Sequence, residues 1–147
     1  MARCADVMTR EPVCAEPADS IVRIAQLMKG EDVGAVPVVE ARSSRKLVGI
    51  VTDRDIVVKV VAEGKSVEKA TVRDAMTNDT VTCREEDDIN QAVERMAERK
   101  VRRILVVDGA GTLRGIISQA DIATRVHRDE TTGELVEAIS EPGTVRK

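Results

Sequence analysis

The apolar and polar stretches of this chain follow one pattern that occurs twice. Residues 47–56 read LVGIVTDRDI, an apolar run broken by one glycine and followed at once by a charged segment. Residues 113–122 read LRGIISQADI, again with a glycine in the run, a hydroxyl residue at its end and an aspartate three positions later. Apolar β-branched runs favour strands, and Thr or Ser followed three residues later by an acidic residue favours a helix start. The repetition predicts an internal duplication.

An amphipathic helix precedes this unit in each half. Apolar residues recur at i, i+3, i+4 and i+7 spacing over residues 21–28 and, 68 positions later, over residues 89–96. Asp19 or Ser20 is the candidate N-cap of the first helix, and Asp87 or Asp88 that of the second. The apolar positions are Ile21, Ile24, Ala25 and Met28, then Ile89, Ala92, Val93 and Met96.

Each helix is followed by an apolar strand, at residues 36–39 and 104–107, and then by a polar loop. The loop at 40–46 is two residues longer than the loop at 108–112, and the second contains Gly109 and Gly111. Such a connection favours a hairpin, so the two strands of each half should be antiparallel. Short apolar pieces at 13–14 and 81–83 add one short strand per half. The predicted fold class is α+β, an α/β sandwich-like arrangement.

The duplication also suggests domain boundaries. We place repeat 1 at residues 2–64, a linker at 65–71, repeat 2 at 72–128 and a tail at 129–147. Neither half can bury both faces of its sheet alone, so the repeats should pack on each other around a pseudo-twofold axis. In the tail, Leu135, Val136 and Ile139 predict a short helix.

Residues 56–61, IVVKVV, would form a strand on β-propensity alone. Their repeat partner at 121–128 patterns as a helix and Gly64 suits a helix C-cap, so we predict a helix here. A helix that is apolar on nearly all sides must be covered on nearly all sides. This predicts a homodimer through that helix.

Composition excludes several function classes. The chain contains no Phe, Trp or Tyr, and its formal net charge is −3. Without aromatic rings for base stacking and without an extended basic arm, nucleic-acid binding is not expected. No run is long enough for a membrane span and the start lacks a signal-peptide core, so we expect a cytoplasmic protein that does not bind a membrane.

The cysteines and the single histidine do not form a recognisable reactive site. Cys4, Cys14 and Cys83 lack metal-ligand spacing, and His127 lies in a polar segment. We therefore predict no metal site, no required cofactor and no catalysis. The cysteines are expected to be small buried side chains, with a redox role left open.

The repeated hydroxyl–x–x–aspartate pattern allows two interpretations. Thr52 or Ser118 could donate a hydrogen bond to a phosphate near a helix start, while Asp55 or Asp121 accepts from two ribose hydroxyls. The same spacing is also that of a capping box, which needs no ligand. Gly49 and Gly115 would let a ligand or a neighbouring strand approach the backbone closely. The two roles can coexist.

The ordered set of motifs resembles a tandem pair of CBS domains, the regulatory Bateman module. Each half begins with Asp-x-Met-Thr, at residues 6–9 and 74–77, and continues with the amphipathic helix. An apolar-Pro-Val-Val strand follows at residues 36–39, and Gly-Ile-Val-Thr-x-x-Asp at residues 49–55. The resemblance covers residues 2–128, and the chain is similar to small stand-alone bacterial CBS proteins of the hypoxic-response type.

The resemblance implies adenosine-type ligands, namely AMP, ADP, ATP or S-adenosylmethionine, in clefts between the repeats. It assigns ribose to Asp55 and Asp121, and phosphate to Thr52 and Ser118. Leu105 stands where the family pattern has proline. The alternative is a ligand-free CBS-fold protein that acts through an unknown protein partner. The remaining assignments are the base to Val13, Val36, Pro37, Val81 and Ile104, and further phosphate contacts to Arg54, Arg102 and Arg103.

Overall fold

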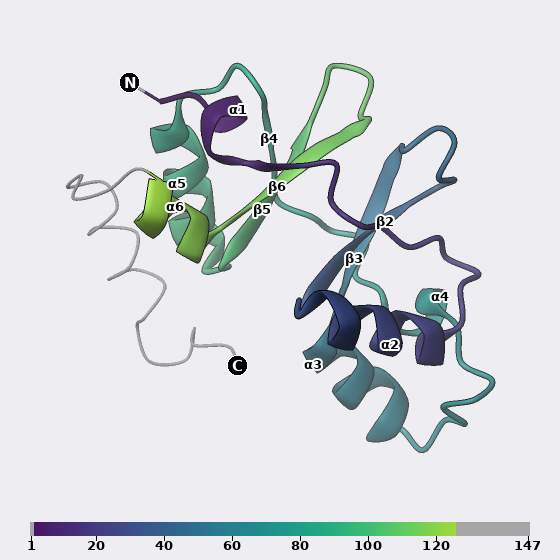
Figure 1. The fold of residues 1–147 in the computed structure, drawn as a ribbon. Coiled ribbons are helices and arrows are strands. Elements are labelled where there is room, and N and C mark those ends of the chain that lie inside the picture. Colours follow the sequence, from purple (N-terminus) through teal and green to yellow (C-terminus); the bar gives the residue numbers. More distant parts are fainter. Residues whose placement is uncertain (1, 126–147) are drawn as a thin grey trace. The chain divides into compact units, whose positions relative to one another are not determined.

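The structure is a computed structural model that describes residues 2–125, and these form two compact units. Unit 1 combines residues 2–11 with residues 81–125, and unit 2 comprises residues 12–80 (Figure 1). We call the first residues of each repeat its lead segment, residues 2–11 in repeat 1 and residues 72–80 in repeat 2. Each lead segment packs within the unit that contains the helices and the strand hairpin of the other repeat. The predicted tail helix lies outside the described residues.

Unit 2 is built on an antiparallel hairpin of β2 (Ala35–Val39) and β3 (Leu47–Thr52). The register places Val36 opposite Val51, and Ala35 opposite Thr52. The antiparallel pairing predicted from the loop is confirmed. The helical elements are α2 (Ile21–Glu31), α3 (Asp53–Ile56), η1 (Val57–Val61) and α4 (Val72–Ala75).

The core of unit 2 is the apolar stripe of α2 packed with the inner side chains of the hairpin. Ile21 and Ile24 are fully buried in it, together with Val60 of η1. Ala25, predicted to be on the buried stripe, is exposed, and the larger Leu27 packs against the core instead. Leu removes more apolar area from water than Ala does, which favours this rotation of the helix face.

The helix predicted at residues 56–61 is confirmed, but its second part is a π-helix. The N–H of Ala62 donates to the carbonyl of Val57 at 2.8 Å, and that of Lys65 to Val60 at 3.1 Å. The element ends at Val61 with Ala62 as its C-cap, and Gly64, where the sequence analysis placed the C-cap, lies two residues further on with a φ of +72°. Val60 is buried, whereas Val57, Val58 and Val61 are exposed in the single chain.

Unit 1 contains a four-stranded sheet with the order β1-β6-β5-β4. Strands β5 and β6 form the antiparallel hairpin, β4 runs parallel to β5, and β1 pairs antiparallel with β6. The strands are β1 (Thr9–Arg10), β4 (Thr82–Arg84), β5 (Arg103–Val107) and β6 (Leu113–Ser118). The helices are α1 (Cys4–Val7), α5 (Ile89–Arg99) and α6 (Gln119–Arg125).

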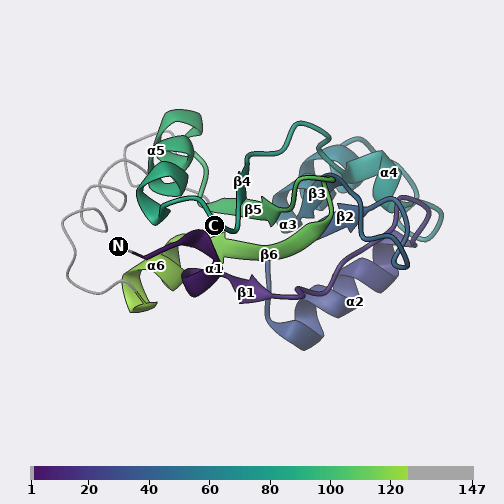
Figure 2. The same ribbon diagram turned by 90° about the horizontal axis from the view of Figure 1, so that it is seen from above.

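The three helices of unit 1 lie at one end of strands β5 and β6 in both views (Figures 1 and 2). Their shared core contains Val7 of α1, Met96 of α5 and Ile122 of α6, packed against Ile104 and Ile117 of the sheet. The predicted apolar positions of α5 are all buried. Within residues 2–125, no helix has the length and apolar character needed to cross a bilayer.

The short strand predicted at residues 13–14 is absent, and an isolated parallel bridge between Ala15 and Val38 stands at that place in unit 2. The matching piece in unit 1 is strand β4, where the N–H of Leu105 donates to the carbonyl of Val81 at 3.0 Å. Pro37 occupies the place of Leu105 in unit 2 and has no N–H to donate. The Pro-to-Leu difference between the repeats therefore explains why only one of them has the extra strand.

Candidate ligand-binding site

Both hydroxyl–aspartate pairs form capping boxes at the end of a strand. In unit 2, Thr52 Oγ1 accepts the Asp55 N–H at 3.1 Å, and Asp55 Oδ2 accepts the Thr52 N–H at 3.0 Å. In unit 1, Ser118 Oγ accepts the Asp121 N–H at 3.1 Å, and Asp121 Oδ2 accepts the Ser118 N–H at 2.9 Å. The capping interpretation is confirmed, and it uses one carboxylate oxygen of each aspartate. The other oxygen, Oδ1, lies outside the box.

In each repeated strand, another backbone segment passes directly against the glycine, and we call this contact the crossing. A Cβ on Gly49 would lie 2.7 Å from the carbonyl oxygen of Thr77, and one on Gly115 would lie 2.8 Å from that of Thr9. Thr77 and Ile50 exchange two main-chain hydrogen bonds at 2.9 and 2.8 Å. Of the two partners that the sequence allowed for these glycines, the structure shows a neighbouring backbone segment, which is strand β1 at Gly115 and an isolated bridge at Gly49. Each crossing segment is the Asp-x-Met-Thr motif.

The crossing in unit 2 brings two further polar groups to Asp55. Lys59 Nζ lies 3.3 Å from Asp55 Oδ1, and the hydroxyl of Thr77 donates to the same oxygen at 3.5 Å. Lys59 also donates to Thr77 Oγ1 at 3.1 Å. Sequence reasoning missed both residues. The available signals were the i,i+4 spacing of Asp55 and Lys59 and the threonine of the Asp-x-Met-Thr motif.

Unit 1 presents a related arrangement around Asp121. Strand β1 pairs Thr9 with Ile116 of β6, which corresponds to the bridge between Thr77 and Ile50 in unit 2. The register of β5 and β6 also places Arg103 opposite Ser118. Among residues 2–124, the carboxylate of Asp121 accepts a hydrogen bond from the Ser118 N–H alone.

The apolar candidates differ in how accessible they are. Val36 and Ile104 are fully buried in the cores of their units, and Pro37 is buried as well. Val13 is 37% exposed, and Val81 is partly buried against the core of unit 1. Side-chain contact with a ligand is therefore open to Val13 and Val81, whereas the buried residues could contribute main-chain groups. Of the cationic candidates, Arg54 is exposed, and Arg102 and Arg103 are partly buried.

All three cysteines are free and buried, as the sequence predicted. The sequence did not reveal that Cys4 and Cys83, from different repeats, lie together in unit 1 with their Sγ atoms 3.4 Å apart. Within residues 2–125, no three His, Cys, Asp or Glu side chains are placed to hold a metal ion.

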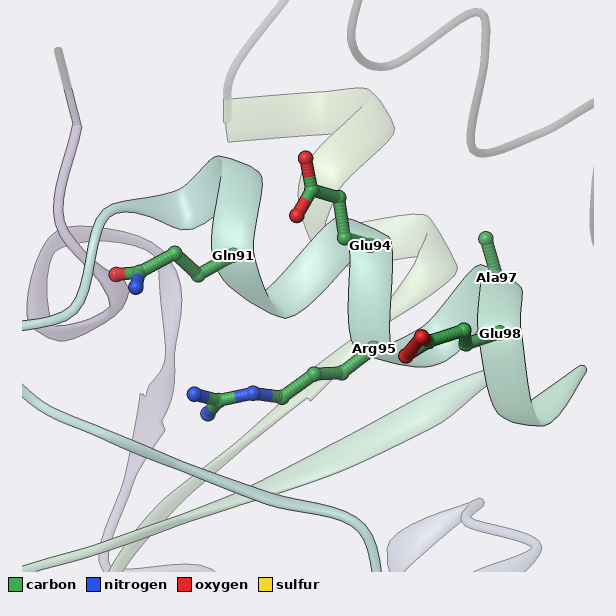
Figure 3. A pocket seen from close by; sticks show the side chains of 5 residues that line it. All are labelled: Gln91, Glu94, Arg95, Ala97 and Glu98. Carbon is green, nitrogen blue, oxygen red and sulfur yellow. The ribbon is translucent and has the colours of Figure 1, made fainter.

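A surface depression of about 610 Å³ lies on α5, away from the capping boxes. Its described lining comes from that helix alone, with Gln91 and the Glu94, Arg95 and Glu98 side chains beside Ala97 (Figure 3). A depression lined by one face of a single helix, with acidic and basic groups mixed, does not define a ligand class. None of its residues belongs to the candidate site.

Comparison with known proteins identifies the family. The model of the CBS domain matches the chain twice, over residues 4–62 and 72–128. Hypoxic response protein 1 of Mycobacterium tuberculosis is 30% identical over 142 residues, which are 97% of this chain and 96% of that protein. Protein MK0525 of Methanopyrus kandleri is 34% identical over 117 residues, 80% of this chain and 59% of MK0525. The chain thus spans less than two thirds of that relative.

Two solved structures are similar in fold. The crystal structure of hypoxic response protein I with two coordinated zinc ions has a TM-score of 0.75 and 30% identity, covering 84% of this chain and 98% of that one. The CBS domain pair of protein MJ0100, in complex with 5′-methylthioadenosine and S-adenosyl-L-methionine, has a TM-score of 0.73 and 26% identity, covering 84% and 94%. The repeated motifs, the two units and these matches agree that the chain belongs to the CBS-domain family and carries two copies of the domain.

Proposed function

We propose that this protein is a regulatory module that binds adenosine-type ligands (AMP, ADP, ATP or S-adenosylmethionine) through the carboxylates of Asp55 and Asp121. The observation that carries the proposal is the paired geometry of the two sites. Each aspartate is held in place by Oδ2 in a capping box and has Oδ1 outside the box. Oδ1 of Asp55 faces Lys59 and Thr77, which a ligand would have to displace or share. The MJ0100 pair, a relative in sequence and fold, has adenosine derivatives bound.

The capping boxes leave the chemistry of nucleotide binding available. The Thr52 and Ser118 hydroxyl oxygens accept hydrogen bonds in the boxes, so their own protons can be donated to a phosphate. A carboxylate oxygen that accepts from vicinal ribose hydroxyls makes charge-assisted bonds, worth about 1.5–3 kcal/mol each. Arg54 in unit 2 and Arg103, opposite Ser118 in unit 1, are the proposed cationic phosphate contacts.

The base would contact the remaining candidates in two ways. Val13 and Val81 have accessible side chains that can cover an apolar base face. Val36, Pro37 and Ile104 are buried and would contribute main-chain groups. In this proposal the repeats span residues 2–64 and 72–128, the protein is a cytoplasmic homodimer, and it binds without catalysis or a required cofactor.

Thermal unfolding with a ligand panel tests the proposal. A ligand at a hundredfold excess over its dissociation constant stabilises the native state by about 2.7 kcal/mol. For a chain of this size the melting temperature should rise by several degrees with AMP, ADP, ATP or S-adenosylmethionine, and not with GMP.

Three aspartate variants separate ligand binding from helix capping. Asp55→Asn and Asp121→Asn keep a carbonyl oxygen for the box but remove the charge, so each should reduce the ligand-induced shift. Asp74→Asn is the matched control, because Asp74 accepts the Thr71 N–H at 2.9 Å in a box outside the candidate sites. If the ligand raises the melting temperature of all three variants equally, Asp55 and Asp121 serve in helix capping alone.

The second candidate function is a ligand-free interaction protein of the same fold. The exposed valines of η1 favour it, because an apolar surface of this kind is suited to a protein partner. If no adenosine ligand at millimolar concentration moves the melting temperature of the wild-type protein, this second function replaces the first.

A further inference from the structure

The N-terminal segment and the second repeat place two thiols in contact. Cys4 is the first residue of α1 and Cys83 is the middle residue of β4, 79 positions later, and their Sγ atoms lie 3.4 Å apart. Their exposed fractions are 0% and 2%. Cys14, the third cysteine, is buried in unit 2 and belongs to a different compact unit.

Main-chain hydrogen bonds hold this contact in place. The N–H of Cys4 donates to the carbonyl of Asp87 at 2.8 Å, and that of Ala5 to Glu85 at 3.0 Å. Cys83 is fixed by the pairing of β4 with β5, in which it lies opposite Val106. The two sulfur atoms are therefore neighbours because of the backbone positions and not only because of side-chain rotamers.

We propose that Cys4 and Cys83 form a thiol-oxidation site, at which a hydroperoxide converts the two thiols into a disulfide that ties residues 2–11 to β4. The sulfur atoms must approach from contact distance to a bond length of about 2.05 Å, an adjustment within reach of small side-chain rotations. The nearest alternative, a disulfide to Cys14, would need a cysteine from the other unit.

The chemistry balances in two steps. The Cys4 thiolate attacks one peroxide oxygen, the O–O bond breaks, and a sulfenic acid and hydroxide form. The sulfur of Cys83 then attacks the sulfenic sulfur, the S–S bond forms, the S–O bond breaks, and the second oxygen leaves as water after taking up the Cys83 proton. Two thiols and one hydroperoxide molecule thus yield a disulfide and, for hydrogen peroxide, two water molecules.

The electrostatics of the pair favour this order of attack. The Cys83 thiol donates to Cys4 Sγ, which lowers the pKa of Cys4. The same hydrogen bond raises the pKa of Cys83, and burial raises it further. Cys4 is therefore the more acidic thiol of the pair and is assigned the first attack, while Cys83 resolves the sulfenic acid.

Burial determines when oxidation occurs. Both sulfur atoms are buried, so a peroxide reaches them only when the packing around α1 loosens while the two thiols stay in contact. Once formed, the disulfide closes a loop of about eighty residues, which restricts the unfolded chain. The oxidised protein should consequently melt on the order of 10 °C higher than the reduced protein.

Peptide mapping of the full chain tests the proposal. The reduced protein is treated with hydrogen peroxide, remaining thiols are blocked with N-ethylmaleimide, and the protein is digested with trypsin without reduction. The three cysteines fall in separate tryptic peptides, residues 4–10, 11–23 and 74–84. We expect peptide 4–10 linked to peptide 74–84 as the dominant disulfide, while Cys14 carries the maleimide.

Variants and stability measurements complete the test. Cys14→Ser should keep both the link and the increase in melting temperature, whereas Cys4→Ser and Cys83→Ser should each lose both. Dithiothreitol should reverse the increase in the wild type. Links that involve Cys14, links between chains, or thiols that resist peroxide until the protein is unfolded would each overturn the proposal. The mapping of the wild type decides the question even if a variant does not fold.

Discussion

At the scale of single residues, the two candidate sites differ in what surrounds the carboxylate. The Oδ1 atom of Asp55 already faces the ammonium of Lys59 and the hydroxyl of Thr77. Ribose hydroxyls would use the same oxygen, so Lys59 competes with the ligand that Asp55 is proposed to bind. The Asp55 side chain is 15% exposed and that of Lys59 is 40% exposed, which leaves the lysine room to move away.

Replacing Lys59 by Met should strengthen the binding of adenosine to unit 2. The variant removes an ion pair that is partly open to solvent, worth up to about 1 kcal/mol, so the dissociation constant should fall by about three- to fivefold. Isothermal titration calorimetry measures the change. Adenosine is the probe because it has no phosphate to pair with the lysine. Lys65→Met, at an exposed lysine beyond η1, is the control and should bind as the wild type does.

An unchanged affinity in Lys59→Met would show that the ammonium does not compete for Asp55. The aspartate variants described above would then decide separately whether Asp55 contacts the ribose. The two experiments therefore test different claims about one carboxylate.

At the scale of elements, the hairpin loop of unit 2 is tied to the start of α2 by a charged contact. Arg42 Nη2 lies 2.6 Å from Asp19 Oδ2, and Glu16 donates its N–H to the same oxygen at 2.9 Å. Burial raises the pKa of Asp19, but the hydrogen bonds from Arg42 and from Glu16 outweigh it, and the net pKa is lowered.

Replacing Arg42 by Met should destabilise the protein at neutral pH by about 0.5–1 kcal/mol, since the arginine is substantially exposed. A lowered folded-state pKa contributes stability above the unfolded pKa of about 4, and that contribution is lost as pH falls through the folded value. The difference between wild type and variant should therefore shrink below about pH 4. Urea unfolding at several pH values measures it.

Arg45→Met is the matched control for the pH dependence. Arg45 lies in the same loop and donates to the carbonyl of Pro12 at 3.3 Å and towards Cys14 Sγ at 3.6 Å. Neither acceptor is a carboxylate, so the destabilisation caused by this variant should stay constant across the acid range. A parallel decline in both variants would contradict the role assigned to Asp19.

The crossing at Gly49 is the second feature at this scale. Gly49→Ala would place a methyl group 2.7 Å from the Thr77 carbonyl oxygen and 2.5 Å from Met76 Cε. The crossing segment would have to move, so we expect a loss of about 1–3 kcal/mol in the free energy of unfolding. Gly30→Ala in α2 meets nothing within 4 Å and should instead stabilise by about 0.5–1 kcal/mol.

Denaturant unfolding of both glycine variants checks the contrast. The result that would contradict the crossing is a Gly49→Ala protein as stable as the wild type. Gly115→Ala extends the comparison to unit 1, where the added methyl group would approach Met8 Sδ at 2.6 Å.

At the scale of the whole molecule, η1 presents an apolar surface that the described residues leave uncovered. Val57, Val58 and Val61 are 57%, 42% and 55% exposed. We expect a second copy of the chain to cover them, as predicted from the sequence of this helix, which is apolar apart from Lys59. Val58→Glu should then shift the sedimentation coefficient from a dimer to a monomer at micromolar concentration.

Val33→Glu is the control for the dimer, because Val33 is an exposed valine of the same unit outside η1. It should sediment as the wild type does. A wild-type protein that is monomeric at micromolar concentration would rule out the dimer directly.

The local elements could be predicted from the sequence because periodicity and capping are local signals. The duplication, the helix at residues 56–61 and the close approach at Gly49 followed from residue pattern alone. The sequence could not predict which of the two lead segments crosses Gly49 and which crosses Gly115. Both segments carry Asp-x-Met-Thr, so the sequence is symmetric with respect to the two pairings. The contact between Cys4 and Cys83 depends on that choice and was hidden for the same reason.

The exchange of lead segments has a consequence for synthesis on the ribosome. Residues 2–11 are made before unit 2, but their partners begin at residue 81, so this segment must wait unpaired while the next 69 residues are added. Unit 2, residues 12–80, is continuous in the chain and can fold as soon as it leaves the exit tunnel. The segment that precedes unit 2 in the chain therefore joins the unit that is completed after it.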